Sequence, residues 1–291
     1  MDASNTVDMH HVAPPLRAVV DAAQIHERVV RWRDAVQSDP RNARTRASET
    51  VLPLLISTLA SQSGVVVICA TDADAERLAS AIGWYVGEGL AAAYLTRGVQ
   101  YGGGIAPSPA RVGSRERARG VARSGGVVVA SIEALVERVP RSEDRTQAVC
   151  VSVGDRIDRD ELIRRLVDAG YERVEQAEQR GQIAARGDIV DLFPTTEANP
   201  VRVEFFDDEI EGIRSFSSYT QRSLGSMQQV IALPAAEIAG LDPHDPRWAD
   251  GGDTDDADTG DAVLDGRGRR GNCGDERHAE GAAHEARQHR Q

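Results

Sequence analysis

Two uniformly apolar segments mark the first half of the chain, Val65–Ala70 and Val127–Ala130. Each is followed by a residue that can cap a helix and then by apolar positions at helical spacing, over 73–86 and 132–139. Strands that are apolar on both faces are typical of parallel sheets covered by helices. The pattern therefore predicts an α/β domain with an open, mostly parallel sheet over residues 46–150.

After residue 150 the long apolar runs give way to shorter, alternating segments. A helix is expected over Arg159–Ala169, because Asp158 and Glu161 have the spacing of a capping box and Gly170 can end it. Four strands are expected after this helix, at Gln182–Ala185, Ile189–Phe193, Val201–Phe206 and Glu209–Phe216. Turn residues separate them, so antiparallel pairing and a following α+β domain over 151–238 are predicted.

The two ends of the chain carry less pattern. Residues 1–45 form a polar extension with one amphipathic helical stretch, Leu16–Val36. Periodicity is lost again over 239–291, where the segment 250–265 holds seven aspartates and no basic residue. Such a composition buries too little apolar surface to offset chain entropy, so a disordered acidic tail is predicted.

Composition narrows the possible classes of function. All 34 basic residues are arginine, and the net charge is -12. A P-loop needs a lysine that contacts the nucleotide phosphates, and the sequence has none. A strongly acidic protein is also poorly suited to binding along the phosphate backbone of nucleic acids. Both classes are therefore disfavoured, although a GC-rich coding sequence is the simpler explanation of the arginine bias.

Location is indicated by what the sequence lacks. No apolar run approaches the length of a membrane span, and the amino terminus does not have the pattern of a secretory signal. The three cysteines, at 69, 150 and 273, are too far apart to suggest a disulfide framework or a zinc site. We expect a cytoplasmic protein without membrane contact.

The predicted strand Val201–Phe206 has two different faces. Period two gives a core face of Val201, Val203 and Phe205 and an outer face of Arg202, Glu204 and Phe206. An exposed aromatic side chain beside charged ones is typical of a binding hot spot. The alternative is a cross-strand salt bridge with Phe206 packed under a loop, and spacing alone leaves both open.

Other polar clusters have simpler explanations. The acidic run Asp207–Glu209 is typical of a solvated turn rather than a metal site, and Gly187 is assigned to backbone geometry. The glycines at 102–104 do not have phosphate-loop spacing and are expected in a surface loop. Most histidines lie in the two ends, without other ligands at metal-binding spacing. We expect no metal, no cofactor and no catalytic residue.

A long run of residues after 150 resembles a known family. The segments are YERVEQAEQRGQ at 171–182, ARGDIVDLFP at 185–194, PVRVEFFDDEI at 200–210, IRSF at 213–216 and TQRS at 220–223. In this order they resemble the interaction domain that UvrB shares with the transcription-repair coupling factors. IALPA at 231–235 and, more weakly, PSPARVGSR at 107–115 resemble the coupling factors in particular.

The resemblance implies a partner and a surface. It implies binding to UvrA, with Arg186, Arg202, Glu204 and Phe206 at the positions through which the family contacts that protein. UvrB has a further arginine where Ala184 stands here, so one contact is altered. DNA is then reached only indirectly, through the repair complex, and no RNA polymerase contact is expected from this chain.

The resemblance also implies a degenerate, P-loop-like nucleotide site. In UvrB a Walker A loop leads into the α/β domain, and Ser48, Glu49 and Thr50 correspond to it here. The glycines are missing, and a glutamate near the lysine position repels phosphate, so no nucleotide binding is predicted. Because no Walker B or helicase motif follows, we also expect no enzymatic activity.

Three hypotheses about function therefore remain. The first, which we prefer, is a UvrA-binding module of bacterial nucleotide excision and transcription-coupled repair without a translocase motor. The second is a UvrB-like subunit that binds ATP and damaged DNA, which the missing lysine and the acidic charge disfavour. The third is a non-functional truncated remnant of a coupling factor, because the pattern is lost where the family sequence continues.

Overall fold

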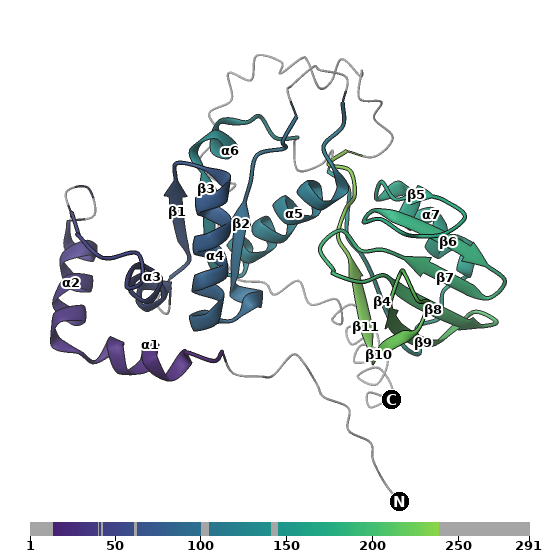
Figure 1. Cartoon of the computed structure of the whole chain (residues 1–291), viewed down its shortest axis with the longest axis horizontal. Coiled ribbons are helices and arrows are strands. Elements are labelled where there is room, and N and C mark those ends of the chain that lie inside the picture. The colour runs from purple at the N-terminus through teal and green to yellow at the C-terminus, as the bar shows by residue number, and fades with distance from the viewer. Residues whose placement is uncertain are drawn as a thin grey trace, which may run out of the picture.

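The computed structural model describes residues 14–39, 41, 43–60, 63–99, 105–140 and 145–238. The predicted acidic tail and the glycines at 102–104 lie outside these residues. Figure 1 shows a first body of helices around a small sheet and a second body built mostly of strands. The mixed α/β architecture with a parallel sheet is confirmed.

The first body opens with three helices, α1 (Arg17–Gln24), α2 (Glu27–Ser38) and α3 (Leu52–Ala60). The amphipathic stretch predicted over 16–36 is therefore two helices rather than one. The break falls at His26, whose backbone is extended and whose Nδ1 accepts a hydrogen bond from the Arg28 amide at 3.3 Å. His26 thus caps α2 and ends the run of α1.

A three-stranded parallel sheet follows, in the order β1 (Val65–Cys69), β3 (Val127–Ser131) and β2 (Ala91–Tyr94). The helix α4 (Asp72–Val86) covers one face and α5 (Pro109–Arg123) covers the other at β2 and β3. The short helices η1 (Glu88–Leu90) and α6 (Ile132–Val136) complete this body.

Three details of the first body differ from the sequence prediction. The pattern predicts neither β2 nor α5, and α6 ends at Val136 instead of residue 139. Val66 and Ile68 are exposed, although β1 is predicted to be buried on both faces. The reason is that β1 is an edge strand, and the buried residues of α5 pack on β2 and β3 instead.

The second body combines a helix with mostly antiparallel strands, the kinds of element that the sequence predicts after residue 150. Its elements are β4 (Val149–Ser152), α7 (Arg159–Asp168), β5 (Glu172–Arg173), β6 (Gln182–Arg186), β7 (Ile189–Leu192), β8 (Val201–Phe206), β9 (Glu209–Phe216), β10 (Ser223–Met227) and β11 (Gln229–Ala232). Six strands form one sheet in the order β10-β9-β8-β7-β6-β5, and β11 pairs with β4. All pairs in this body are antiparallel except β5 with β6.

The helix α7 packs on the inner face of the six-stranded sheet. Leu162, Ile163 and Leu166 meet the buried side chains of β6 to β9 there. The Asp158 carboxylate accepts hydrogen bonds from the amides of Asp160 and Glu161, as predicted. Glu161 does not complete the capping box, because its carboxylate pairs with arginines one turn further along α7.

The two bodies are joined by buried charges. Glu237, which follows β11, is fully buried and accepts hydrogen bonds from Arg97 at 2.7 Å and from Arg115 of α5 at 2.9 Å. Arg115 also donates to Glu137 at 2.8 Å. This ion-pair cluster fixes the end of the second body against the first. Within the part of the chain that is described, no helix is long and apolar enough to cross a membrane.

Candidate protein-interaction face

The strand β8 presents two chemically different faces, as its sequence predicts. Val201, Val203 and Phe205 are buried in the core against α7. Arg202 and Glu204 point to the opposite side and are partly exposed. We call this side of the six-stranded sheet the outer face.

Arg202 is held in one position on the outer face. It donates two parallel hydrogen bonds to Asp191 of β7, at 2.6 Å from Nε and 2.7 Å from Nη2. Its guanidinium lies 4.8 Å from the ring centroid of Phe216, a buried residue at the end of β9. The hydrogen bonds that Arg202 donates to Asp191 raise the pKa of Arg202, so the group carries its charge at every accessible pH.

Glu204 is also paired across strands. Its carboxylate lies 2.7 Å from Nη2 of Arg214 on β9, and both side chains are partly exposed. The cross-strand salt bridges of the alternative hypothesis are therefore present. They order the charged side chains without removing them from solvent.

Phe206 differs from that alternative, because none of the described loops covers its ring. Its side chain is 74% exposed at the end of β8, opposite Glu209 in the register. The intervening two-residue turn contains Asp207, whose φ is 60°. The acidic run predicted as a turn is thus confirmed, with Arg156 lying 3.2 Å from Glu209. Phe206 is therefore an exposed aromatic residue beside the ordered ion pairs of Arg202 and Glu204.

Arg186 lies on the same outer face. In the register it pairs with Ile189, which pairs in turn with Glu204. Its guanidinium donates to the carbonyl of Glu175 at 2.8 Å and remains exposed. The sheet therefore brings all four predicted residues to one face. Ala184 occupies the neighbouring row, opposite Asp191, and is buried.

Sequence reasoning missed the partners of these residues. The outer face is fixed by Asp191, Arg214 and Phe216. The sequence alone does not identify them as partners, because cross-strand pairs depend on register and not on spacing within one strand. The alternation of buried and exposed positions within β7 places Asp191 on the outer face, and this pattern is visible in the sequence.

The residues predicted to form a degenerate nucleotide site lie elsewhere. Ser48, Glu49 and Thr50 are exposed, in the segment and turn that precede α3. Residues 43–51 contain no strand, whereas a P-loop stands between a strand and a helix. The Ser48 and Thr50 hydroxyls lie 3.0 Å from each other. The absence of nucleotide binding stays a prediction.

The carboxyl ends of the parallel strands, where ligands of such sheets usually bind, hold a carboxylate. Asp72 accepts hydrogen bonds from Ser131 at 2.6 Å, from the Thr96 hydroxyl at 2.7 Å and from Arg111 at 2.8 Å. Burial opposes its charge, but the hydrogen bonds from Ser131 and Thr96 outweigh this effect and lower the pKa of Asp72. A fixed negative charge at this edge repels phosphate.

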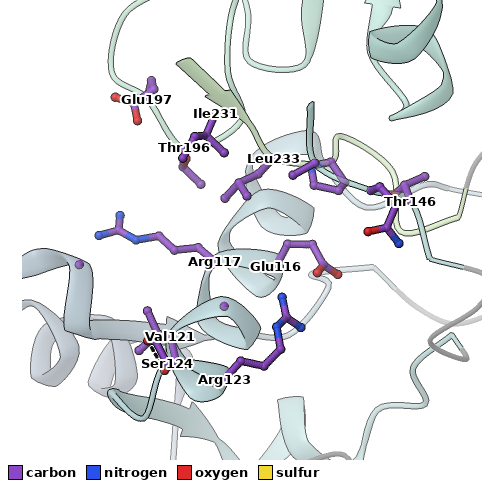
Figure 2. A pocket seen from close by; sticks show the side chains of 15 residues that line it. Glu116, Arg117, Val121, Arg123, Ser124, Thr146, Thr196, Glu197, Ile231 and Leu233 are labelled. Atoms are coloured by element: carbon purple, nitrogen blue, oxygen red, sulfur yellow. Dashed lines mark hydrogen bonds between the residues drawn. The ribbon is translucent and has the colours of Figure 1, made fainter. Parts of the chain in front are cut away.

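A cavity of about 420 Å³ lies between α5 and the second body. Figure 2 shows Glu116, Arg117 and Arg123 of α5 along one wall and Ile231 and Leu233 on the other. Its lining carries charges of both signs. Among residues whose placement is described, no three His, Cys, Asp or Glu side chains form a metal-binding group.

The second body is similar to parts of known proteins. Residues 149–238 match the family model of the UvrB interaction domain. The chain is 39% identical over 113 residues to a transcription-repair-coupling factor of Bacillus subtilis, covering 38% of this chain and 10% of that protein. It is 36% identical over 123 residues to UvrABC system protein B of Streptococcus uberis, covering 42% of this chain and 19% of that protein.

A longer match includes part of the first body. It is 33% identical over 196 residues to a transcription-repair-coupling factor of Mycobacterium tuberculosis, covering 64% of this chain and 16% of that protein. The chain thus spans 10% to 19% of the length of these relatives. The six-stranded sheet with its outer face lies inside residues 149–238, so this part of the chain is similar to the UvrB interaction domain.

Proposed function

We propose that residues 149–238 bind the repair protein UvrA, and that the chain is a cytoplasmic, non-catalytic interaction module of bacterial nucleotide excision and transcription-coupled repair. The observation that carries the proposal is the exposed ring of Phe206 beside ordered charges, within a domain of the UvrB interaction family. UvrA is identified by the family and not by the geometry.

The outer face suits binding because its charged side chains are ordered before the partner arrives. The forked hydrogen bonds to Asp191 and the stacking on Phe216 hold Arg202 in one rotamer. Ordering a long side chain in advance lowers the entropy cost of association. Phe206 then supplies the apolar area that the charged residues lack.

The remaining charges set the pattern that a partner must complement. The Glu204–Arg214 pair is partly exposed and lies between Arg202 and Phe206 along β8. Arg186 adds a positive charge on β6, two strands from β8. Such rim charges act mainly on association rate and partner choice. Contact with DNA is expected only through UvrA, given the net charge of -12.

The non-catalytic part of the proposal is supported by the first body. The chain has no lysine that could bind a phosphate. The turn before α3 carries the carboxylate of Glu49, and the carboxylate of Asp72 lies at the carboxyl ends of the parallel strands. Calorimetric titration with ATP and Mg²⁺ is expected to give no binding at micromolar concentrations. A micromolar dissociation constant would contradict this part of the proposal.

The UvrA-binding part is tested by titrating purified UvrA against the full chain. The substitution Phe206→Ala is expected to weaken binding by about 2 kcal/mol or more, as for other aromatic hot spots. Trp84→Ala is the matched control, because Trp84 is 58% exposed but lies on α4 of the first body. The control is expected to bind like the wild type.

Circular dichroism and thermal unfolding establish that both variants are folded. Equal affinity of the Phe206→Ala variant and the wild type would exclude Phe206 as an anchor of the binding surface. No binding by the wild type would exclude UvrA as the partner of this chain.

A further inference from the structure

The loop that follows β9 presents a second exposed aromatic side chain. We call residues 217–222 the Tyr219 loop. Tyr219 is 96% exposed, and no other large hydrophobic side chain in the described ranges is more exposed. Neither the predicted binding residues nor the proposed function includes it.

The Tyr219 loop is fixed by its own hydrogen bonds. The Ser217 amide donates to the Arg222 carbonyl at 2.9 Å, and the Gln221 amide donates to the Ser217 carbonyl at 2.8 Å. The Gln221 side chain donates to the Ser218 carbonyl at 3.0 Å. Gln221 has a φ of 58°, a left-handed conformation that these bonds maintain. A fully exposed ring therefore stands on an ordered support.

The same loop is joined to the outer face. Oε1 of Gln221 accepts a hydrogen bond from Nη2 of Arg202 at 3.4 Å. Phe216, over which Arg202 stacks, is the last residue of β9 and directly precedes the loop. The Tyr219 loop thus borders the Arg202 end of β8.

Phe206 lies at the opposite end of that strand. The four-residue step from Arg202 to Phe206 spans roughly 13 Å of extended chain. The outer face is therefore a strip of ordered ion pairs, with the exposed Phe206 at one end and the loop that holds Tyr219 at the other. Two rigid aromatic residues around a charged strip form the pattern of an interface with two anchors.

We infer that Tyr219 is the second aromatic anchor of the UvrA-binding surface, and this inference rests on the proposed function. The partner surface would provide an apolar pocket for the ring, because the ring is the large apolar part of a tyrosine side chain. The loop would also set specificity, since its position is fixed by contact with Arg202.

The experiment measures UvrA affinity of the full chain by titration with purified UvrA. Tyr219→Ala is expected to weaken binding about tenfold or more, and Tyr219→Phe by less than about threefold if the ring provides the contact. Both variants are expected to unfold at the wild-type temperature, because the side chain is almost completely exposed. Trp84→Ala serves again as the exposed aromatic control.

The double variant Phe206→Ala/Tyr219→Ala separates two anchors from one. Additive losses are expected, because sites this far apart act independently. Wild-type affinity of Tyr219→Ala together with weakened Phe206→Ala would overturn this inference alone. Absence of binding by the wild type would overturn the proposed function and this inference with it.

Discussion

Glu237 and Arg115 form a fully buried ion pair, with 2.9 Å between Oε1 and Nε, although they stand 122 residues apart in the sequence. Glu237 follows the last strand of the second body, and Arg115 lies on α5 of the first. Their contact makes the junction between the bodies a part of the folded core and not a flexible linker. The outer face is therefore held in a fixed position relative to the first body.

Removing Glu237 is expected to destabilise the whole chain. The variant Glu237→Ala leaves Arg97 and Arg115 buried with one carboxylate fewer, and breaking a buried pair typically costs about 3–5 kcal/mol. Urea unfolding measures this loss, with Glu76→Ala on the exposed side of α4 as the control. A loss equal to that of the control would contradict the proposed joining role.

The two glycines of α5 at 113 and 120 are expected to respond oppositely to alanine. A Cβ atom at Gly113 would lie 2.1 Å from Oγ1 of Thr195 in the second body, whereas one at Gly120 meets nothing within 4 Å. Gly113→Ala should therefore cost about 1–3 kcal/mol through overpacking. Gly120→Ala should stabilise by up to about 1 kcal/mol through helix propensity. Thermal and urea unfolding measure the change in the free energy of unfolding of each variant. Equal changes in the two variants would contradict close packing of Gly113 against Thr195.

The strands of the second body were predictable because their sequence alternates clearly. The predicted bounds of β8 and β9 agree with the structure, and the outward positions of Arg202, Glu204 and Phe206 follow from period two. The exposure of Phe206 did not follow, since the same spacing fits a ring beneath a loop. The ring is uncovered because the connection between β8 and β9 is a turn of two residues.

Features that depend on partners distant in sequence were not predictable. The strand β2 begins with three alanines, which have little intrinsic preference for strands and no alternation. It forms because β3 and two helices surround it. In the same way, the pairing of Arg202 with Asp191 depends on the register of β8 against β7.

Tyr171 is expected to make stability depend on alkaline pH. Burial raises the pKa of Tyr171 from 10.0 to about 12, and its hydroxyl donates to the Leu233 carbonyl at 2.9 Å. Because the folded state holds the proton more tightly than the unfolded state, this stabilisation is complete below pH 10. It is lost as the pH rises from about 10 to about 12, by about 2–3 kcal/mol.

The variant Tyr171→Phe isolates this effect. It is expected to lose about 1 kcal/mol at neutral pH, because one buried hydrogen bond is removed. Between pH 10 and 12 its unfolding free energy should fall less steeply than that of the wild type. Parallel pH profiles for the two proteins would mean that Tyr171 titrates normally in the folded state.

A charge swap separates the binding role of Arg202 from its structural role. Arg202→Glu alone places a carboxylate opposite Asp191 and should weaken UvrA binding and also cost about 1–3 kcal/mol of stability. The double variant Asp191→Arg/Arg202→Glu restores an ion pair with its polarity reversed. It should regain most of the lost stability in urea unfolding and still bind UvrA poorly, because the charge presented to the partner remains inverted. Recovery of affinity together with stability would mean that Arg202 only supports the sheet, and the anchors would then be Phe206 and Tyr219.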